Sequence, residues 1–274
     1  MADLGSMAGF LGGWSMDIGR MNNPNLGSGR IVNSADWTNG AAGPNNHDGF
    51  MLSTDLGGVD FDLHYWGNND GSEDNAMIFN FGLGDMAGFA DIGFYYATAS
   101  AAAATEDPSW MAFNVNNIGG DALMGIDIDV EYATYDADAG GEDGTLTSVS
   151  VGYTLDQFKL SFSNSVADAD WAGINNDPHG THGITDLFNG GDLDNTTIGV
   201  STDGLMEGVG VTLNFITIAR DSDGADLGSE IDLILDFSCG QLGYASFSAD
   251  DAGLTDTDYL YWQSSYDFSE ILCI

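Results

Sequence analysis

The sequence predicts an all-β fold, an antiparallel up-and-down β-barrel of roughly 14 to 16 strands. Three observations support this prediction. Apolar and polar side chains alternate over segments of about 7 to 12 residues, no segment has the spacing of an amphipathic helix, and short turns alternate with long polar loops. All short turns would lie at one rim and all long loops at the other, which is the layout of a transmembrane barrel.

Length and composition indicate a single barrel domain over residues 1–274. Glycine is abundant, at 39 residues, and proline is scarce, at 4, while aromatic residues reach 11%. This mixture suits many strands joined by turns, because a chain without a core has fewer aromatic and β-branched residues. The sequence contains no continuous apolar run long enough for a membrane-spanning helix.

Residues 49–66 form the clearest element, a β-hairpin that turns at Gly57 and Gly58. Pairing across this turn places Leu56 beside Val59, and the alternation then assigns each remaining side chain to a face. The apolar face carries Phe50, Leu52, Thr54, Leu56, Val59, Phe61, Leu63 and Tyr65. The polar face carries Met51, Ser53, Asp55, Asp60, Asp62, His64 and Trp66.

The other predicted strands are recognised by apolar residues at every second position. Before the hairpin, residues 14–18 form one strand and residues 2–10 a weaker candidate. After it come segments around residues 77–83, 89–97, 111–115, 126–133, 147–153, 158–162, 198–200, 209–215, 231–237, 242–246 and 260–268.

The number of strands depends on how residues 2–10 are counted. Bacterial single-chain barrels have even strand numbers, so roughly 14 strands starting at Trp14 close a barrel. Counting residues 2–10 as well implies a preceding strand and a parent barrel of roughly 16 strands. The opening residues lack a basic segment followed by an apolar core, and we therefore expect a signal peptide and an N-terminal strand to be missing.

The net charge of −39 narrows the range of partners. The chain has 43 Asp and Glu residues and only 4 Lys and Arg residues. A nucleic-acid partner is excluded, because contacts to phosphate need basic side chains. The expected partners are cations, or hydrophilic solutes that tolerate a negative field. An acidic surface is also typical of adaptation to high salt, which is compatible with any fold.

Carboxylates recur between apolar neighbours of the same strand, where they would share the inner face of a barrel. In a lipid-embedded barrel these charges must point away from hydrocarbon, into a water-filled pore that favours cations. The alternative is a soluble sandwich with a solvated acidic face. The predicted pore-lining residues are Asp55, Asp60, Asp62, His64, Asp127, Asp129, Glu131, Asp232 and Asp236.

Two acidic loops contain enough oxygen ligands to suggest calcium, which takes six to eight of them. In one of these loops the candidate ligands are Asp221, Asp223 and Asp226, although their spacing is not that of an EF-hand. No other cofactor is expected. No nucleophile elbow, phosphate loop or dinucleotide fingerprint is present, so the sequence predicts no enzyme. Whether Cys239 and Cys273 pair is left open.

The region from residue 14 to residue 66 resembles outer-membrane porins of the alginate-export type. The resemblance rests on Ile18-Gly19-Arg20, Gly29-Arg30-Ile31-Val32, Ser34-Ala35-Asp36-Trp37 and His47-Asp48-Gly49-Phe50. It implies a monomeric or oligomeric barrel, such as a trimer, that passes hydrophilic solutes across the outer membrane. It also implies that Arg20, Arg30, Asp36 and Asp48 form a loop-ordering network near the pore.

The chain departs from this family in its charge. A porin for an anionic polysaccharide needs a basic lumen, and beyond the resembling region only Lys159 and Arg220 are basic. Alginate is therefore not the expected solute. The sequence instead predicts an outer-membrane porin with an acidic lumen, which contacts lipid and lets small hydrophilic solutes or cations diffuse passively. The alternative is a secreted or surface acidic β-sheet protein that binds calcium and self-assembles.

Overall fold

The computed structural model describes residues 2–3, 13–22, 46–67, 75–84, 89–100, 108–119, 123–137, 141–171, 191–206 and 208–264. The strands within these ranges are β1 (Ala2–Asp3), β2 (Ser15–Asn22), β3 (Asn46–Asp55), β4 (Asp60–Gly67), β5 (Asn75–Leu83), β6 (Asp91–Ser100), β7 (Ser109–Asn116), β8 (Ile126–Asp136), β9 (Gly144–Leu155), β10 (Phe158–Ala167), β11 (Leu193–Met206), β12 (Val209–Ala219), β13 (Asp226–Phe237), β14 (Gly240–Ala249) and β15 (Thr257–Ser264). None of the described residues belongs to a helix that is long and apolar enough to cross a membrane.

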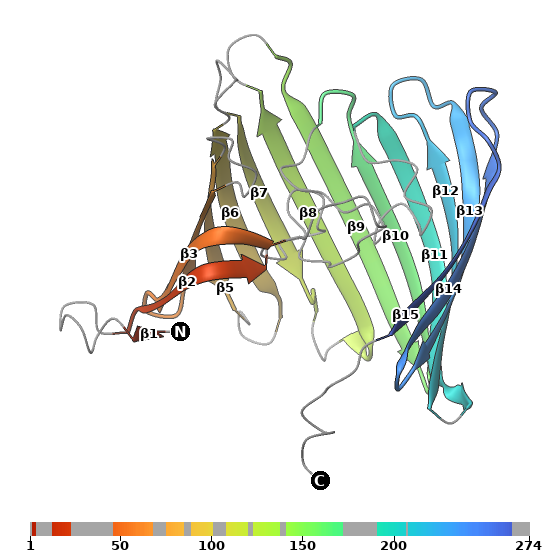
Figure 1. Ribbon diagram of the computed structural model, residues 1–274, viewed down its shortest axis with the longest axis horizontal. Coiled ribbons are helices and arrows are strands. Elements are labelled where there is room, and N and C mark those ends of the chain that lie inside the picture. The colour runs from red at the N-terminus through yellow and green to blue at the C-terminus, as the bar shows by residue number, and fades with distance from the viewer. Residues whose placement is uncertain are drawn as a thin grey trace.

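All of these strands belong to one 15-stranded sheet, in which each strand pairs with its neighbour in sequence. Every pairing is antiparallel, as in β7 with β8 and β12 with β13. Figure 1 shows the result as a strongly curved sheet of tilted strands, with β1 and β15 at its two edges in the described part of the chain. The predicted all-β, up-and-down antiparallel fold is therefore confirmed.

The predicted alternation of short turns and long connections holds from β9 to β15 but is not strict, because residues 117–125 at the short-turn end form a longer connection than residues 137–143 at the other end. Residues 156–157 and 238–239 make tight turns, whereas residues 168–192 and 220–225 connect strands at the opposite end of the sheet. We call these two ends the short-turn rim and the long-loop rim. Of the weak candidate at residues 2–10, the structure describes only β1, which pairs with Ser15 and Met16.

The predicted hairpin is formed by β3 and β4, and its turn has the expected conformation. Gly57 and Gly58 have φ angles of +79° and +97°, and the Leu56 amide donates to the carbonyl oxygen of Val59 over 2.8 Å. The Asp55 carboxylate accepts the amide hydrogens of both glycines, at 2.7 and 2.9 Å. Asp55 therefore orders the turn at the short-turn rim.

Cross-strand register separates the two faces of the sheet. Phe61 pairs with Phe81, which pairs with Phe94 and then Phe113, and the last two are 40% and 48% exposed. The neighbouring residue, Asp62, starts a row on the other face that leads to fully buried Tyr95. The hairpin's phenylalanines thus lie on the outer face and its aspartates on the inner face, as predicted.

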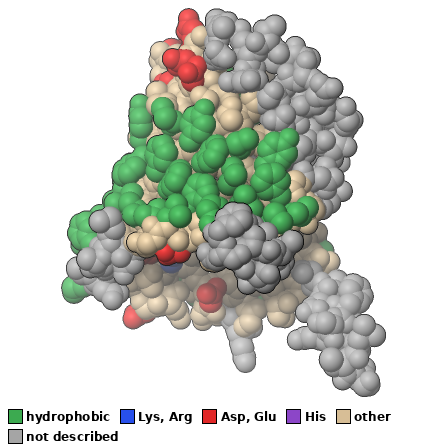
Figure 2. Space-filling model, turned by 90° about the vertical axis from the view of Figure 1, so that its left-hand side faces the viewer, with side chains coloured by type: hydrophobic (Ala, Val, Ile, Leu, Met, Phe, Trp, Pro, Cys, Tyr) green, Lys and Arg blue, Asp and Glu red, His purple; other side chains and the backbone are tan. Residues whose placement is uncertain are grey.

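The outer face carries an exposed apolar band. Figure 2 shows hydrophobic side chains gathered across the middle of one side of the molecule, with acidic side chains above and below. On β12 the outward residues from Val209 to Phe215 cover about 20 Å along the strand. This length, extended by the side chains, is comparable with the band of about 25 Å on outer-membrane barrels. A soluble protein rarely exposes such a continuous apolar surface.

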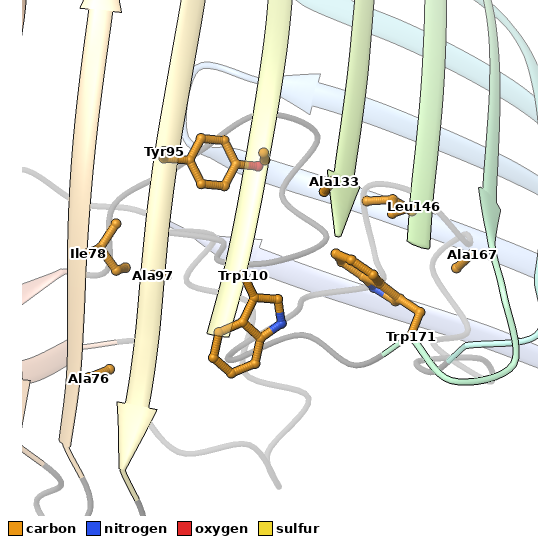
Figure 3. Packing of buried hydrophobic residues seen from close by; sticks show 10 residues of the cluster. Ala76, Ile78, Tyr95, Ala97, Trp110, Ala133, Leu146, Ala167 and Trp171 are labelled. Atoms are coloured by element: carbon orange, nitrogen blue, oxygen red, sulfur yellow. The ribbon is translucent and has the colours of Figure 1, made fainter. Parts of the chain in front are cut away.

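Most buried side chains of the inner face near the long-loop rim are apolar, which the sequence did not predict, although Glu131 and Glu230 are also buried there. One cluster includes Ile78, Ala97, Trp110 and Leu146, and a second includes Ile218 and Phe247. Figure 3 shows Trp171, from the connection after β10, lying beside Ala133 near the end of β8 and Leu146 near the start of β9. The long-loop half of the inner wall is therefore a packed core and not an open lumen surface.

Substituting Gly144 should loosen this core. A Cβ at Gly144 would lie 2.6 Å from the backbone nitrogen and Cα of Trp171, which cannot move without displacing the loop. We expect Gly144→Ala to cost about 1–3 kcal/mol of stability, seen as a lower thermal unfolding temperature in detergent. Gly84→Ala is the matched control, because a Cβ there meets nothing within 4 Å. Equal effects from both variants would contradict this account of the loop packing.

Candidate functional site on the inner wall

The predicted carboxylates of β8 lie on the inner face and become more buried toward the long-loop rim. Asp127 is exposed, Asp129 is half-buried and Glu131 is only 4% exposed. They occupy every second position of the strand, so they form one column along it. Only the short-turn half of this column faces open space.

Hydrogen bonds hold this column in place. Asp129 accepts the Asn117 amide hydrogen at one carboxylate oxygen and the Ser150 hydroxyl at the other, each over 3.0 Å. Glu131 accepts a hydrogen bond from the Tyr95 hydroxyl, and both of these side chains are buried. The carboxylates are thus oriented by the wall, which is what a fixed electrostatic surface requires.

A second group of carboxylates lies on the inner face of β13. Asp232 is 2% exposed, whereas Asp236 is exposed near the short-turn rim. Asp236 accepts a hydrogen bond of 2.6 Å from the Gln241 amide, whose oxygen accepts one of 2.6 Å from the Tyr261 hydroxyl. Glu230 shares this face and is completely buried. Glu230 is not among the predicted pore-lining residues, although the same alternation could have identified it.

The hairpin supplies the remaining predicted pore-lining residues. Asp60 is exposed, and Asp62 accepts a hydrogen bond from the Asn80 amide over 3.4 Å. His64 is 8% exposed, because it lies in the half of the wall that is packed. Thus the predicted residues share one face of the sheet, but they are distributed over β3, β4, β8 and β13 and do not converge on a single point.

A recess on this wall lies over β8, β9 and β10 and has a volume of about 390 Å³. Its lining combines the β8 carboxylates with serines of β9 and β10 and with Lys159. Gly152 leaves room at its centre: a Cβ there would lie 3.3 Å from Lys159 Cε and 3.7 Å from an Asp127 carboxylate oxygen. The structure thereby brings a cation and several carboxylates together around small hydroxyl side chains.

The loop network implied by the alginate-export resemblance falls largely outside the described residues. Arg30 and Asp36 are not described, while Arg20 and Asp48 are opposite each other in the register of β2 and β3. A different network is present at the long-loop rim. Arg220 lies 3.9 Å from Asp192, 3.0 Å from Asp223 and 3.5 Å from Asp251, as measured between guanidinium nitrogens and carboxylate oxygens. One arginine thus connects three separate loops.

Two aspartates of this rim have shifted pKa values. The pKa of Asp223 is lowered, first by the hydrogen bond from the Ala225 amide and then by Arg220. The pKa of Asp221 is raised, first by desolvation and then by the negative charges of Asp192, Asp194 and Asp168.

The candidate calcium ligands do not converge. Asp223 binds Arg220, and within the described ranges no group of three or more His, Cys, Asp or Glu side chains is arranged to hold a metal ion. Calcium binding by Asp221, Asp223 and Asp226 therefore stays a prediction. Cys239 is exposed with a free thiol, and Cys273 lies outside the described residues.

Replacing Arg220 should free the three loops. We expect Arg220→Gln to weaken their attachment by about 1 kcal/mol, since partly exposed ion pairs contribute little individually, and to speed loop cleavage by subtilisin at pH 7. Because the pKa of Asp223 is lowered, its contribution is complete above its usual pKa of about 3.9 and is lost as the pH falls through the lowered value.

The difference between Arg220→Gln and the unsubstituted protein, followed by thermal unfolding, should therefore disappear in strong acid. Arg220→Lys is the graded control, because an ammonium group keeps the charge but cannot reach several carboxylates as a guanidinium does. A difference that persists when the carboxylates are protonated would rule out the ion pairs as its cause.

Comparisons with known proteins place the fold. No protein-family model matches the chain, and neither does any curated protein. Solved structures do match. OccK11 (OpdR) of Pseudomonas aeruginosa is 13% identical, with a TM-score of 0.67 over 91% of this chain and 76% of that one. The outer membrane protein OpdK of the same organism is 11% identical, with a TM-score of 0.66 over 92% and 77%. OccAB1 of Acinetobacter baumannii is 11% identical, with a TM-score of 0.60 over 92% and 73%.

These neighbours define the structural class. They belong to the OprD/Occ group of outer-membrane porins, so the chain has the fold of bacterial outer-membrane β-barrels. The likeness supports this broad class and does not single out the alginate-export porins that residues 14–66 resemble. At such low sequence identity this likeness shows the fold.

Proposed function

We propose that this protein is an outer-membrane porin through which small hydrophilic solutes and ions diffuse passively, with a preference for cations. One observation carries the proposal: the same strands place apolar side chains on an exposed outer face and carboxylates on the inner face. Leu213 and Ile231 on the outside are 44% and 49% exposed, while Asp232, next to Ile231 in sequence, points inward and is buried.

The physics of a bilayer favours this arrangement over a water-soluble sheet. Apolar side chains on the outer face lose contact with water when lipid covers them, which stabilises the inserted state by about 25 cal/mol per Å². Carboxylates on the inner face raise the local concentration of cations and repel anions. The acidic soluble β-protein considered from the sequence has no comparable explanation for the exposed apolar band.

The proposed channel makes and breaks no covalent bond. Selection arises from the fixed field of Asp127, Asp129 and Asp236, which lie on the accessible part of the wall. The resemblance to alginate-export porins contributes only the expectation of a hydrophilic solute, since an acidic wall disfavours an anionic polysaccharide.

Planar-bilayer recording tests this function directly. Purified protein added to a bilayer that separates 0.1 M from about 1 M KCl is expected to open channels whose reversal potential has the sign of a cation current. Channels that prefer anions would remove the electrostatic part of the proposal. A protein that stays soluble without detergent and forms no channels would remove the porin assignment altogether.

A further inference from the structure

The recess over β8, β9 and β10 has a floor of small side chains in register. Ser150 pairs with Ser163, Ser148 pairs with Ser165 and Gly152 pairs with Ser161. These pairs lie side by side on the inner face, so their hydroxyls are separated by roughly the 5 Å of a cross-strand pair. The volume of about 390 Å³ is within the range of about 300–1,000 Å³ for small-molecule pockets.

A second glycine brings more polar atoms to the edge of this floor. Gly199 on β11 pairs with Ser161 on one side and with Asn214 on the other. A Cβ at Gly199 would lie 2.4 Å from the Ser161 hydroxyl oxygen and 2.6 Å from an Asn214 side-chain oxygen. Glycine therefore lets these two polar side chains lean over the same backbone position, so a side-chain amide lies next to the hydroxyl of Ser161 at the edge of the floor.

The charges around the floor are of both signs. Asp127 is exposed and Asp129 is fixed by hydrogen bonds, so each presents carboxylate oxygens that only accept. Lys159 reaches over Gly152 from β10 and presents an ammonium group that only donates. The serine hydroxyls between them both donate and accept. The recess consequently offers hydrogen-bond acceptors, hydrogen-bond donors and hydroxyls that do both, within one small volume.

A ligand that satisfies all three kinds of group must itself both donate and accept. A metal or ammonium cation is attracted by the carboxylates but repelled by the ammonium group of Lys159, and an anion is repelled by the surrounding carboxylates. We infer that this recess binds an uncharged polyhydroxylated solute of the size of a monosaccharide or a sugar alcohol. The inference rests on the proposed channel function and names a substrate class for that channel.

Single-channel recording with D-glucose and sorbitol as probes tests the inference. Each should interrupt the potassium current in a concentration-dependent way, with half-maximal block at about 1–100 mM, as expected for a weak complex. Triethylene glycol is the matched control solute, because its chain is similar in size but has only two hydroxyls. It should lower the current without discrete interruptions.

Substitutions then locate the site. Ser161→Ala combined with Ser163→Ala removes two hydroxyls from the floor and should raise the half-blocking concentration about ten- to one-hundredfold, since each of the two lost hydrogen bonds contributes a factor of about three to ten. Ser201→Ala combined with Thr212→Val is the control, because both residues are on the inner face in the next row and do not line the recess. Its half-blocking concentration should be unchanged.

The outcomes separate the two proposals. A cation channel that neither sugar interrupts, or equal losses in both double variants, would overturn the sugar site and leave the porin assignment standing. If no channel forms, saturation-transfer NMR on the detergent-solubilised protein reads binding without conductance. There, loss of the glucose signal in the Ser161/Ser163 variant alone would support the site, and no signal with the unsubstituted protein would refute it.

Discussion

Leu213→Lys is expected to prevent stable membrane insertion, or to lower the stability of the inserted barrel by about 2–4 kcal/mol, the cost of a lysine at the lipid-facing midplane. Leu213 is 44% exposed and lies on the outer face between rows that are also apolar. An ammonium group there would be surrounded by hydrocarbon. The measurement is the fraction of protein that becomes protease-resistant and heat-modifiable after folding into lipid vesicles.

Asn214→Lys provides the control for this experiment, because it adds the same charge one residue further along the same strand. Asn214 faces inward and is opposite Asp232 in the register of β12 and β13. An inward lysine meets carboxylates and not lipid, so insertion should be nearly unchanged. If Asn214→Lys failed to insert while Leu213→Lys succeeded, the assignment of the two faces would be reversed.

The double variant Asp127→Asn, Asp129→Asn should lose much of the preference for cations that we propose for this channel. Removing one charge about 7 Å from the ion path changes the energy of a monovalent ion by about 0.6 kcal/mol at the dielectric constant of water. The energy of an anion changes by the same amount in the opposite direction, and screening at 0.1 M salt roughly halves both changes, so the ratio of cation to anion permeability should fall by roughly threefold per charge. The reversal potential in a potassium chloride gradient measures this ratio.

Two controls make the permeability measurement specific: a repeat at high salt, and a variant that removes charges from a loop. At 1 M salt the Debye length shrinks to about 3 Å, so the effect of the substitutions should largely disappear. Glu142→Gln combined with Asp143→Asn removes the same number of charges from an exposed loop next to β8 and β9. This control should change the ratio much less. Equal effects would mean that net charge, and not the inner wall, sets the selectivity.

The parts of the fold that follow from local alternation could be predicted from the sequence. In residues 49–66 the spacing of Phe61 and Asp62 determined opposite faces, and the register confirms both. Gly57 and Gly58 marked the turn because few other residues tolerate their positive φ angles. The carboxylates of β8 were assigned to the inner face from the same alternation, because side chains two residues apart on a strand lie on the same face.

The packed half of the inner wall could not be predicted in this way. Ala97, Ala133 and Leu146 are inward-facing but apolar, because they contact other inner-wall residues and Trp171 instead of water. Alanine fits either environment, so it carries little information in an alternating pattern. The Arg220 network was missed for another reason: two of its partners, Asp192 and Asp251, lie in other loops distant in sequence, and the consecutive pairing of β10 to β15 brings these loops to the same rim.

The order of strands in the sheet has a consequence for how the protein is assembled. Each described strand pairs only with the strands before and after it in sequence, from β1 to β15. Such pairings have a low contact order within each hairpin, so the entropy lost in closing each loop is small. The sheet can therefore grow one hairpin at a time, with every newly formed strand offering an edge to the next. Only the step that joins the two ends of a barrel would require residues distant in sequence to meet, and this step should be the slowest in refolding.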